Sequence, residues 1–448
     1  MGAFHAYDIR GIYNVDFDKE VAYKVGYFLP ELLSADKVLV GRDARVSSDE
    51  INEYLLKGIT DAGADVYDAG LCTTPMVYFG TAFYGFKASV QITASHNPAE
   101  YNGMKVSREN ALPVGYDTGL GQIKEWIESG RECPVAQKRG EVHQMDVRKD
   151  YLPFLLKYKG DWSGLKIAMD VSNGMASLFV HEIFGDDVAY IYDQMDGRFP
   201  NHEPNPLVAK NVVDLQNLVA QTKADIGVIF DGDADRVMFV DENSRFISPD
   251  LMIAVLGHYF LEERGEKGYV HQDIRSSKAV GEYLAPMGGV MNTWRVGRAY
   301  AALKLRELDG VFGGELAGHY YFRDFFYSDS GLLAAILILN VVAKMKAQGV
   351  SLSQLIGHIE KYQNSGEINF KIERKKEAMD AVRDYFMSTE KATAYMDFDG
   401  YRVEFPDWWL NIRPSNTEPY LRFLCEATSK ELLDEKVAKV REIVEQYK

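Results

Sequence analysis

The chain has 448 residues, of which 46% are hydrophobic and 26% charged, and its formal net charge at pH 7 is −16. At roughly 100–200 residues per domain, this length predicts three or four globular domains. An acidic chain lacks the basic face that nonspecific nucleic-acid binding requires, so we expect no nucleic-acid partner.

Cysteine usage and apolar patterning favour a cytoplasmic protein. Cys72, Cys133 and Cys425 lie far apart with no CxxC pair, which is typical of a reducing compartment. The N-terminal stretch MGAFHAYDIRG lacks the apolar core of a signal peptide. The longest apolar run, residues 332–342, is too short to cross a bilayer and predicts a buried helix. We therefore expect no membrane partner.

A short apolar strand, a polar turn, a helix and a second strand are expected over residues 37–70. The same pattern recurs over residues 165–192 and 268–294. Strands that alternate with helices predict βαβ units with parallel pairing. Recurrence at intervals of about 100–130 residues predicts three related α/β domains.

The C-terminal part follows a different pattern. A strand and a helix are expected over residues 370–389, strands over 401–405 and 408–428, and a charged amphipathic helix over 429–447. These elements predict a small α+β unit. We place the four domains at residues 1–145, 146–247, 248–364 and 365–448.

The first polar loop of interest, ITASHNPAEYNGMKV (91–105), places Ser95 directly before His96. Neighbouring side chains on an extended segment point to opposite faces, so we expect His96 to be badly placed to deprotonate Ser95. The G-x-S-x-G motif of α/β-hydrolases is also absent. A turn serine near the positive charge of Lys105 suits carrying or receiving phosphate. The alternative is an ordinary turn serine that hydrogen-bonds its own backbone.

The second loop lies in IGVIFDGDADRVMFVDE (226–242), which predicts a strand, an acidic turn and a strand. Asp231, Asp233 and Asp235 occupy alternate positions and can converge on one hard cation, Mg²⁺ or Ca²⁺. An EF-hand is excluded because its sixth loop position must be Gly and is Arg236 here. A solvated acidic hairpin is the alternative, but three carboxylates repel one another without a cation. Arg236 beside them indicates that an anion lies next to the metal.

The third loop, VFGGELAGHYYFRD (311–324), is a Gly-rich turn that carries Glu315 and His319. A carboxylate in this setting can accept hydrogen bonds from sugar hydroxyls, and an imidazole can move protons. A plain Gly-rich turn without a ligand remains the alternative.

The fourth loop, NIRPSNTEPYLR (411–422), places an arginine, two hydroxyls and an amide between apparent strands. These residues are Arg413, Ser415, Asn416 and Thr417. A guanidinium fork with hydroxyl, amide and backbone donors can bind phosphate. A capped turn is the alternative.

The order and wording of the four loops resemble the α-D-phosphohexomutase superfamily over the whole chain. TASHNP resembles its phosphoserine loop, DGDADR its metal loop, GELAGH its sugar-recognition loop and RPSNTEP its phosphate loop. The opening AYDIRG (6–11) is similar to the phosphomannomutase/phosphoglucomutase branch. The phosphoglucosamine mutases usually carry Gly where Asn416 stands.

The resemblance implies a heart-shaped architecture of four domains around a central cleft, with three related α/β domains that have mixed sheets and a C-terminal α+β domain. It implies reversible phosphoryl transfer between C1 and C6 of a hexose phosphate. Mannose phosphates, and also glucose phosphates, would react through a phosphoserine and a hexose 1,6-bisphosphate that serves as activator and intermediate. Phosphoglucosamine mutase and a metal-dependent sugar phosphatase are the alternatives. We expect a monomer or a dimer.

The resemblance also implies a role for each site residue. Ser95, Lys105, Arg10 and His319 would be catalytic, and Mg²⁺ would be held by Asp231, Asp233, Asp235 and a phosphoserine oxygen of Ser95. The implied substrate-binding residues are Tyr7, Asn97, Arg236, Arg275, Arg298, Glu315, Arg413, Ser415, Asn416 and Thr417.

Two positions depart from the family pattern. Ala317 stands where the sugar loop commonly has Ser, so one hydroxyl contact to the sugar is lost or shifted. Arg298 stands where relatives often have His, which implies a phosphate contact in place of a proton-transfer group.

Overall fold

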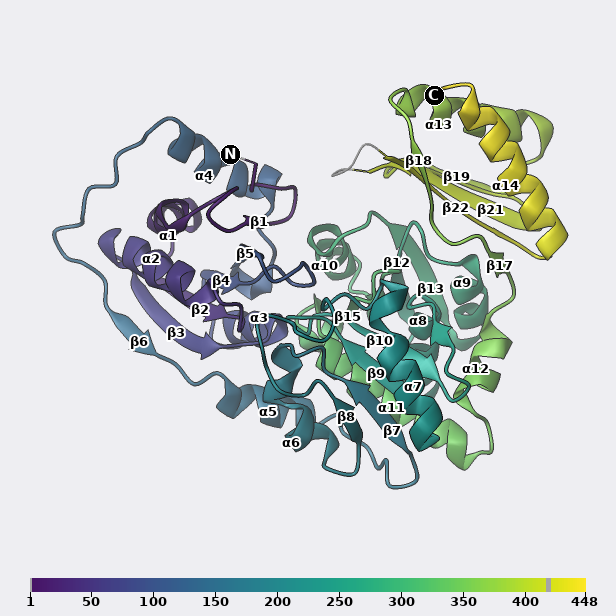
Figure 1. The fold of residues 1–448 in the computed structure, drawn as a ribbon, viewed down its shortest axis with the longest axis horizontal. Helices are drawn as coiled ribbons and strands as arrows, with labels where there is room; N and C mark the ends of the chain where they lie inside the picture. Colours follow the sequence, from purple (N-terminus) through teal and green to yellow (C-terminus); the bar gives the residue numbers. More distant parts are fainter. Residues whose placement is uncertain (1, 416–419) are drawn as a thin grey trace.

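The computed structural model describes residues 2–415 and 420–448. Asn416 and Thr417 therefore lie outside the described residues. Within the described residues the chain forms four β-sheets, one per domain, in sequence order. In Figure 1 the first domain lies at the left, the second and third fill the centre, and the fourth lies beside the third at upper right. The exact boundaries between the domains stay a prediction.

The first domain is a mixed sheet in the order β1-β5-β4-β2-β3-β6. Its strands are β1 (Ile9–Ile12), β2 (Lys37–Arg42), β3 (Asp65–Leu71), β4 (Ala88–Ile92), β5 (Tyr101–Arg108) and β6 (Val142–Gln144). Its helices are α1 (Lys19–Leu33), α2 (Ser48–Asp61), α3 (Thr74–Phe83) and α4 (Leu120–Glu128).

The second domain is a sheet in the order β11-β10-β9-β7-β8. Its strands are β7 (Ile167–Asp170), β8 (Ala189–Ile191), β9 (Ile226–Phe230), β10 (Val237–Asp241) and β11 (Phe246–Ile247). Its helices are α5 (Arg148–Leu156), α6 (Val180–Phe184) and α7 (Val213–Thr222).

The third domain is a sheet in the order β13-β12-β14-β15-β16. Its strands are β12 (Gly268–Asp273), β13 (Gly289–Trp294), β14 (Phe312–Gly314), β15 (Tyr320–Phe322) and β16 (Ser328–Asp329). Its helices are α8 (Leu251–Gly257), α9 (Lys278–Leu284), α10 (Arg298–Glu307), α11 (Gly331–Ala347) and α12 (Leu352–Ile359).

These three sheets share one topology. In each, a βαβ unit gives a parallel pair: β2 with β3, β7 with β8, and β12 with β13. A third strand joins parallel to the first and then turns back as an antiparallel hairpin: β4–β5, β9–β10 and β14–β15. The predicted repeat of three α/β domains with mixed sheets is confirmed. The hairpins carry the serine, acidic and Gly-rich loops, so three candidate loops occupy equivalent positions.

The fourth domain is an antiparallel sheet backed by two helices, as predicted for an α+β unit. Its strands are β17 (Gln363–Asn364), β18 (Ile368–Lys371), β19 (Ala394–Met396), β20 (Tyr401–Glu404), β21 (Trp408–Pro414) and β22 (Tyr420–Ala427). Its helices are α13 (Lys375–Thr389) and α14 (Lys430–Glu445).

Buried polar contacts join the fourth domain to the third. Arg402 Nη1 donates to the carbonyl oxygens of Ile274 at 2.9 Å and Ser276 at 2.6 Å. Ser277 Oγ donates to Glu426 Oε2 at 2.6 Å. Because all five of these residues are buried, the two domains share a buried polar contact next to the loop that follows β12.

Helix starts in the sequence follow ordinary capping chemistry. The side chain of Thr73 accepts a hydrogen bond from Met76 N at the start of α3, and Ser330 accepts one from Leu333 N at the start of α11. Each cap satisfies one of the amide groups that a helix leaves without an internal partner. The caps therefore fix where the two helices begin, next to the candidate site.

The apolar run at 332–342 forms the buried part of α11, as predicted. It belongs to a hydrophobic core that continues from the second domain into the third. Within the described part of the chain, no single helix is long and apolar enough to cross a membrane; the bent pair of α11 and α12 passes that test by length and composition when the two are joined.

Candidate active site

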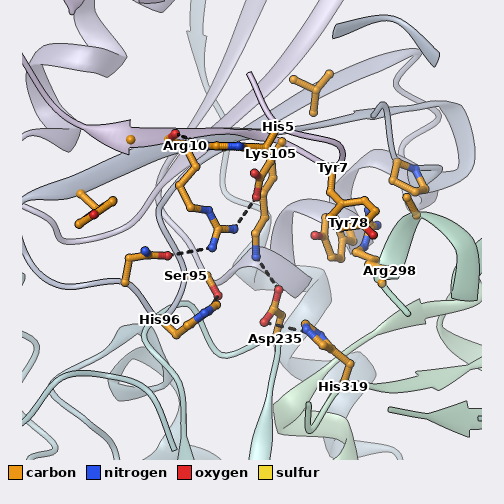
Figure 2. A pocket seen from close by; sticks show the side chains of 18 of the residues that line it. His5, Tyr7, Arg10, Tyr78, Ser95, His96, Lys105, Asp235, Arg298 and His319 are labelled. Atoms are coloured by element: carbon orange, nitrogen blue, oxygen red, sulfur yellow. Dashed lines mark hydrogen bonds and ion pairs between the residues drawn. The ribbon is translucent and has the colours of Figure 1, made fainter. Parts of the chain in front are cut away.

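The first three domains meet at a cavity of about 740 Å³, shown in Figure 2. It is lined by side chains from the N-terminal strand, from the three equivalent hairpins and from the start of α10. The predicted site residues that line it are Tyr7, Arg10, Ser95, Asn97, Lys105, Asp235, Arg298 and His319. Residues that are distant in the sequence are thus brought to one place by the repeated topology.

Ser95 lies at the edge of this cavity in a left-handed backbone conformation, with φ of 52°. Ser95 is 3% exposed, and its Oγ donates to Asp231 Oδ2 at 3.0 Å. The hydroxyl of the first domain therefore contacts the acidic loop of the second domain.

The prediction that the side chains of Ser95 and His96 point to opposite faces is wrong, although the Ser95 hydroxyl donates its hydrogen bond to Asp231. His96 Nδ1 lies 3.3 Å from Ser95 Oγ. The alternation of side chains holds for extended strands, whereas the positive φ of Ser95 turns the chain and brings the two side chains to the same side. Burial, together with the cations Arg236 and Arg10, holds the pKa of His96 well below its usual value, so the imidazole is neutral.

The three carboxylates of the acidic loop converge as predicted. Oxygen atoms of Asp231, Asp233 and Asp235 lie within 4.8 Å of one another, and all three residues are buried. Burial raises the pKa of Asp231 to about 7, and the carboxylates of Asp233 and Asp235 add to this shift. Such a cluster is costly without a nearby cation.

Orphaned oxygens in the cluster fit a hard divalent cation. Asp233 Oδ1 and Asp235 Oδ1 are buried and have no hydrogen-bond partner among the described residues. Buried carboxylate oxygens without partners are rare, and oxygen is the ligand that Mg²⁺ and Ca²⁺ prefer. Asp235, His319 and Asp329 form a second group whose atoms meet the same distance limit.

Two basic side chains reach this site from the first domain. Lys105 on β5 donates to Asp233 Oδ2 at 2.7 Å and to Asp235 Oδ2 at 2.6 Å. Although burial opposes it, these two carboxylates hold the pKa of Lys105 well above its usual value. Arg10 on β1 forms an ion pair with Asp8 and donates to Asn97 Oδ1 at 2.9 Å. Figure 2 shows Arg10 and Lys105 pointing toward Ser95 and Asp235.

The third domain contributes His319 and Arg298, which share one buried carboxylate. His319 Nδ1 lies 2.7 Å from Asp329 Oδ2, and Arg298 Nε donates to Asp329 Oδ1 at 3.0 Å. The Arg298 guanidinium also lies over the ring of Tyr78, 3.6 Å from its centroid. Burial lowers the pKa of His319, but Asp235 and Asp329 outweigh it and raise the pKa above its usual value.

Glu315, the predicted reader of sugar hydroxyls, is 1% exposed and is already hydrogen-bonded. Its Oε1 accepts from Tyr321 Oη at 2.6 Å, and its Oε2 accepts from Gly297 N at 3.1 Å. Glu315 is not among the side chains that line the cavity. In this conformation Glu315 holds the turn before α10 in place.

Three further predicted arginines lie just outside the cavity. Arg236 Nε donates to Asp231 Oδ2 at 2.9 Å, so this arginine is paired within the acidic loop. Arg275 binds both oxygens of Asp273, at 3.0 and 2.8 Å. Burial and the neighbouring charge of Arg275 lower the pKa of Arg413. The positive charge of Arg275 in the third domain thus acts on Arg413 in the fourth, while carboxylates such as Asp273 oppose its effect. An anion bound near both guanidinium groups would be stabilised by them.

The hydroxyl-bearing end of the fourth loop is partly described. Ser415 N donates to the carbonyl oxygen of Tyr420 at 2.8 Å, which closes the hairpin between β21 and β22. The predicted contributions of Asn416 and Thr417 fall outside the described residues.

Sequence reasoning missed several residues of the site. Thr74 Oγ1 donates to Asp233 Oδ2 at 2.5 Å, and Tyr78 lines the cavity one helical turn later. Asp329 joins His319 to Arg298. The TTP sequence at 73–75 is typical of a helix start. Nothing in it indicates a contact with the acidic loop, 159 residues further along the chain. Asp329 ends the short strand β16, in an SDSG sequence that carries no recognisable motif.

Comparison with protein-family models gives four matches in order along the chain. They are described as phosphoglucomutase/phosphomannomutase alpha/beta/alpha domain I at residues 1–132, domain II at 149–244, domain III at 248–362 and the C-terminal domain at 367–443. Together these matches cover most of the chain.

Known proteins and solved structures agree with these models. The chain is 35% identical to a phosphomannomutase of Escherichia coli over 95% of each chain. It is 35% identical to a phosphomannomutase of Methanocaldococcus jannaschii, over 98% of this chain and 97% of that one. A crystal structure of a phosphoglucomutase/phosphomannomutase family protein from Burkholderia thailandensis superposes with a TM-score of 0.87 at 28% identity, over 99% of this chain and 97% of that one. Loops from three domains that meet at Ser95, four family models in order and relatives matched over nearly their full length place the chain in the phosphoglucomutase/phosphomannomutase family of phosphoryl-transferring enzymes.

Proposed function

We propose that this enzyme interconverts mannose 6-phosphate and mannose 1-phosphate, and that it also accepts the corresponding glucose phosphates. The observation that carries the proposal is the hydrogen bond of 3.0 Å between Ser95 Oγ and Asp231, at the meeting point of loops from separate domains. The relatives named phosphomannomutase support mannose phosphates as the leading substrates. A cytoplasmic location and a monomeric or dimeric state stay predictions.

In this proposal Ser95 Oγ stores the phosphoryl group. The P–O bond to Ser95 breaks as a new P–O bond forms to a sugar hydroxyl, and the hydroxyl proton passes to a nearby base. The hexose 1,6-bisphosphate then turns over and returns its other phosphoryl group to Ser95. Phosphoryl transfer depends mainly on in-line positioning and on neutralising charge.

The acidic loop would hold the divalent cation that this chemistry needs. Asp231, Asp233 and Asp235 would bind Mg²⁺ with a phosphoserine oxygen, and the orphaned oxygens of Asp233 and Asp235 support this assignment. Bound Mg²⁺ would neutralise charge on the transferring group. Lys105 and Arg10, which reach the site from the first domain, would stabilise the same group.

His319 is the better base of the two proton-transfer candidates. Lys105 is held as an ammonium by Asp233 and Asp235, so it suits charge stabilisation. His319 points Nδ1 at Asp329, which leaves Nε2 to exchange protons on the cavity side. Its raised pKa is appropriate to a group that both accepts and returns a proton near neutral pH.

The non-reacting phosphate would bind between the third and fourth domains. The charge of Arg275 lowers the pKa of Arg413, which supports a shared site for an anion, and Ser415 follows Arg413 in the same loop. Two guanidinium groups give a dianion paired hydrogen bonds and charge compensation. A non-reacting phosphate bound away from Ser95 would let either end of the sugar be presented to the serine.

The test is turnover of mannose 1-phosphate, glucose 1-phosphate and glucosamine 6-phosphate by the purified chain with Mg²⁺ and a trace of hexose 1,6-bisphosphate. Phosphorus NMR follows both phosphate positions in one sample. We expect mannose and glucose phosphates to isomerise and the rate to depend on the bisphosphate. Preferred turnover of the glucosamine phosphate would overturn the substrate assignment. Release of inorganic phosphate without isomerisation would indicate a phosphatase.

A further inference from the structure

Arg45, in the turn between β2 and α2, is a buried cation that the proposed chemistry does not use. Its side chain is fully buried, with 0% exposure, and it lies beneath the serine loop. Every hydrogen bond of its outer nitrogen atoms goes to a backbone carbonyl of that loop. Burying a charged guanidinium costs free energy, so its hydrogen bonds to one short loop indicate a specific role for it.

The contacts cover the whole turn of the serine loop. Arg45 Nη2 donates to the carbonyl oxygens of Ser95 at 3.0 Å and Asn97 at 2.7 Å. Its Nη1 donates to those of Pro98 at 2.6 Å and Tyr101 at 3.0 Å. Four carbonyl groups from seven consecutive residues therefore point at one planar group.

This arrangement matters because Ser95 has a left-handed backbone conformation, which residues other than glycine rarely adopt. A φ of 52° at a serine persists where surrounding contacts over-determine it. Arg45 supplies such contacts, since it holds the carbonyl oxygens on one side of the turn. The Ser95 hydroxyl then projects toward Asp231 on the other side.

Arg45 is itself fixed from both domains. Its Nε donates to Asp43 Oδ2 at 3.1 Å, and Asp43 Oδ1 accepts from Ser48 Oγ at 2.6 Å. From the second domain, the ring of Phe199 lies 4.9 Å from the guanidinium. The guanidinium therefore links the serine loop to the domain that carries the acidic loop.

We propose that Arg45 is a positioning residue that fixes Ser95 Oγ against the acidic loop for phosphoryl transfer. The catalytic part of this inference rests on the proposed function. A lysine could not replace it, because one ammonium cannot span four carbonyl groups in the plane of a guanidinium fork. The proposal predicts that loosening this contact moves Ser95 while the substrate-binding arginines of the third and fourth domains stay in place.

The experiment compares the full-length Arg45→Lys variant with a matched control, Arg148→Lys. Arg148 also bonds a carbonyl oxygen, that of Leu178 at 2.5 Å, pairs with a carboxylate, Glu182, and lies over a ring, that of Phe179 at 4.8 Å. It lies on α5, away from the cavity. Each protein is examined by hydrogen exchange of the peptide spanning residues 93–102 and by steady-state kinetics.

For Arg45→Lys we expect amides in residues 93–102 to exchange at least about tenfold faster, because the hydrogen bonds of this loop open more often. We expect kcat to fall at least about tenfold while KM stays within about twofold, since displacement of a reacting group by about 1 Å costs up to about a hundredfold in rate. Arg148→Lys should change neither quantity. A merely structural role for Arg45 would lower the melting temperature without this split between kcat and KM.

Phe199→Leu keeps the experiment decisive if Arg45→Lys does not fold. It removes the half-buried ring from the guanidinium and leaves Arg45 itself intact. We expect the same two changes in smaller size, about threefold each. Wild-type exchange and wild-type kcat in a folded Arg45→Lys protein would overturn the proposal. If Arg45→Lys does not fold, the same result in Phe199→Leu would overturn it.

The two readouts separate failure of this inference from failure of the proposed function. Hydrogen exchange needs no substrate, so it reports on the loop even if the wild-type chain does not isomerise hexose phosphates. A wild type that isomerises beside an Arg45→Lys variant with equal kcat refutes the positioning role alone. If the wild-type chain is inactive and Arg45→Lys still exchanges faster, Arg45 orders the serine loop. Its role in the proposed reaction would then be refuted.

Discussion

The Nζ atom of Lys105, on β5 of the first domain, lies 2.6 Å from Asp235 Oδ2 in the acidic loop of the second domain. The same ammonium lies 2.7 Å from Asp233 Oδ2. It thus partly neutralises a cluster that also contains the buried Asp231. A divalent cation bound by these carboxylates would compete with the ammonium for the same oxygens, and would leave Lys105 more available to a phosphoryl group on Ser95.

Metal removal is the first test of this relationship. We expect EDTA to abolish isomerase activity and excess Mg²⁺ to restore it, because three buried carboxylates and a phosphoryl group repel one another without a cation. Mg²⁺ should also raise the melting temperature of the wild-type protein. In Asp233→Asn, which lacks one of the orphaned oxygens, this thermal shift should shrink. Full activity in EDTA would rule out the metal assignment of the acidic loop.

Replacement of Ser95 by Ala tests the phosphoryl carrier. We expect the rate to fall at least about a thousandfold, because no other group can store the phosphoryl group between half-reactions. The fold should survive, since the variant loses only the hydroxyl contacts with Asp231 and His96. Mass spectrometry of the wild-type protein incubated with hexose 1,6-bisphosphate should find one phosphate, on the peptide that contains residue 95. Near-normal turnover by the variant would refute the assignment.

The repeated βαβ pattern and the four polar loops were predictable because short stretches of the sequence determine them. Strand–turn–helix spacing at 37–70, 165–192 and 268–294 predicts parallel pairs, and the pairs are present. What the pattern could not indicate is that the loops occupy equivalent hairpins in three sheets. That equivalence depends on strand order, which is a long-range property.

The wrong expectation for His96 and the missed site residues have physical causes that spacing along the chain does not show. The expectation for His96 assumed an extended strand, and the positive φ of Ser95 removed that assumption. The role of Thr74 follows from a partner in another domain, and that of Asp329 from partners that lie earlier in the chain. Spacing along the chain carries no information about such pairs.

Gly232 in the acidic loop should tolerate no side chain. A Cβ atom at this position would lie 2.4 Å from the backbone carbonyl oxygen of Ser95, which cannot move aside cheaply. We expect Gly232→Ala to separate the two loops and to lower kcat by about tenfold or more. Gly164→Ala is the matched control, because nothing lies within 4 Å of its Cβ position. Equal activity of the two variants, measured in the same assay, would show that the loops need not touch.

Glu426 on β22 should make the contact between the third and fourth domains depend on pH. Its Oε2 accepts from Ser277 Oγ at 2.6 Å and from Trp409 Nε1 at 2.8 Å. Burial, with a contribution from Asp250, raises its pKa to about 7 from a usual 4.5. The folded protein therefore binds this proton more tightly than the unfolded chain, so its contribution to stability is complete below pH 4.5 and is lost as pH rises through 7.

Glu426→Gln isolates this effect, because the amide stays neutral at every pH. We expect the variant to be more stable than the wild type at pH 8, by about 1–2 kcal/mol, and the difference to vanish as pH falls toward 5. Urea unfolding of both proteins at several pH values, followed by tryptophan fluorescence, measures the difference directly. A stability difference that does not vary with pH would contradict the assigned pKa shift.

Asp329 should matter to the active site more than its ordinary sequence context suggests. Its carboxylate accepts from Arg298 Nε at 3.0 Å and lies 2.7 Å from His319 Nδ1, and it is completely buried. Asn at this position keeps the size but removes the charge and turns one acceptor into a donor. We expect Asp329→Asn to lose about 3 kcal/mol of stability, because Arg298 keeps its charge in a buried site. We also expect kcat to fall about tenfold, since His319 and Arg298 lose the group that orients them.

Asp324→Asn in the same domain is the control for this last prediction. Asp324 pairs with Arg264 at 2.6 Å near the surface, where solvent screens the charges. Removing that pair should cost at most about 1 kcal/mol and leave kcat unchanged. If both variants lost equal stability and kept wild-type kcat, the ion pairs of Asp329 would contribute to stability alone. A selective fall of kcat in Asp329→Asn, with His319 and Arg298 still present, would mean that their orientation as well as their charge contributes to the rate.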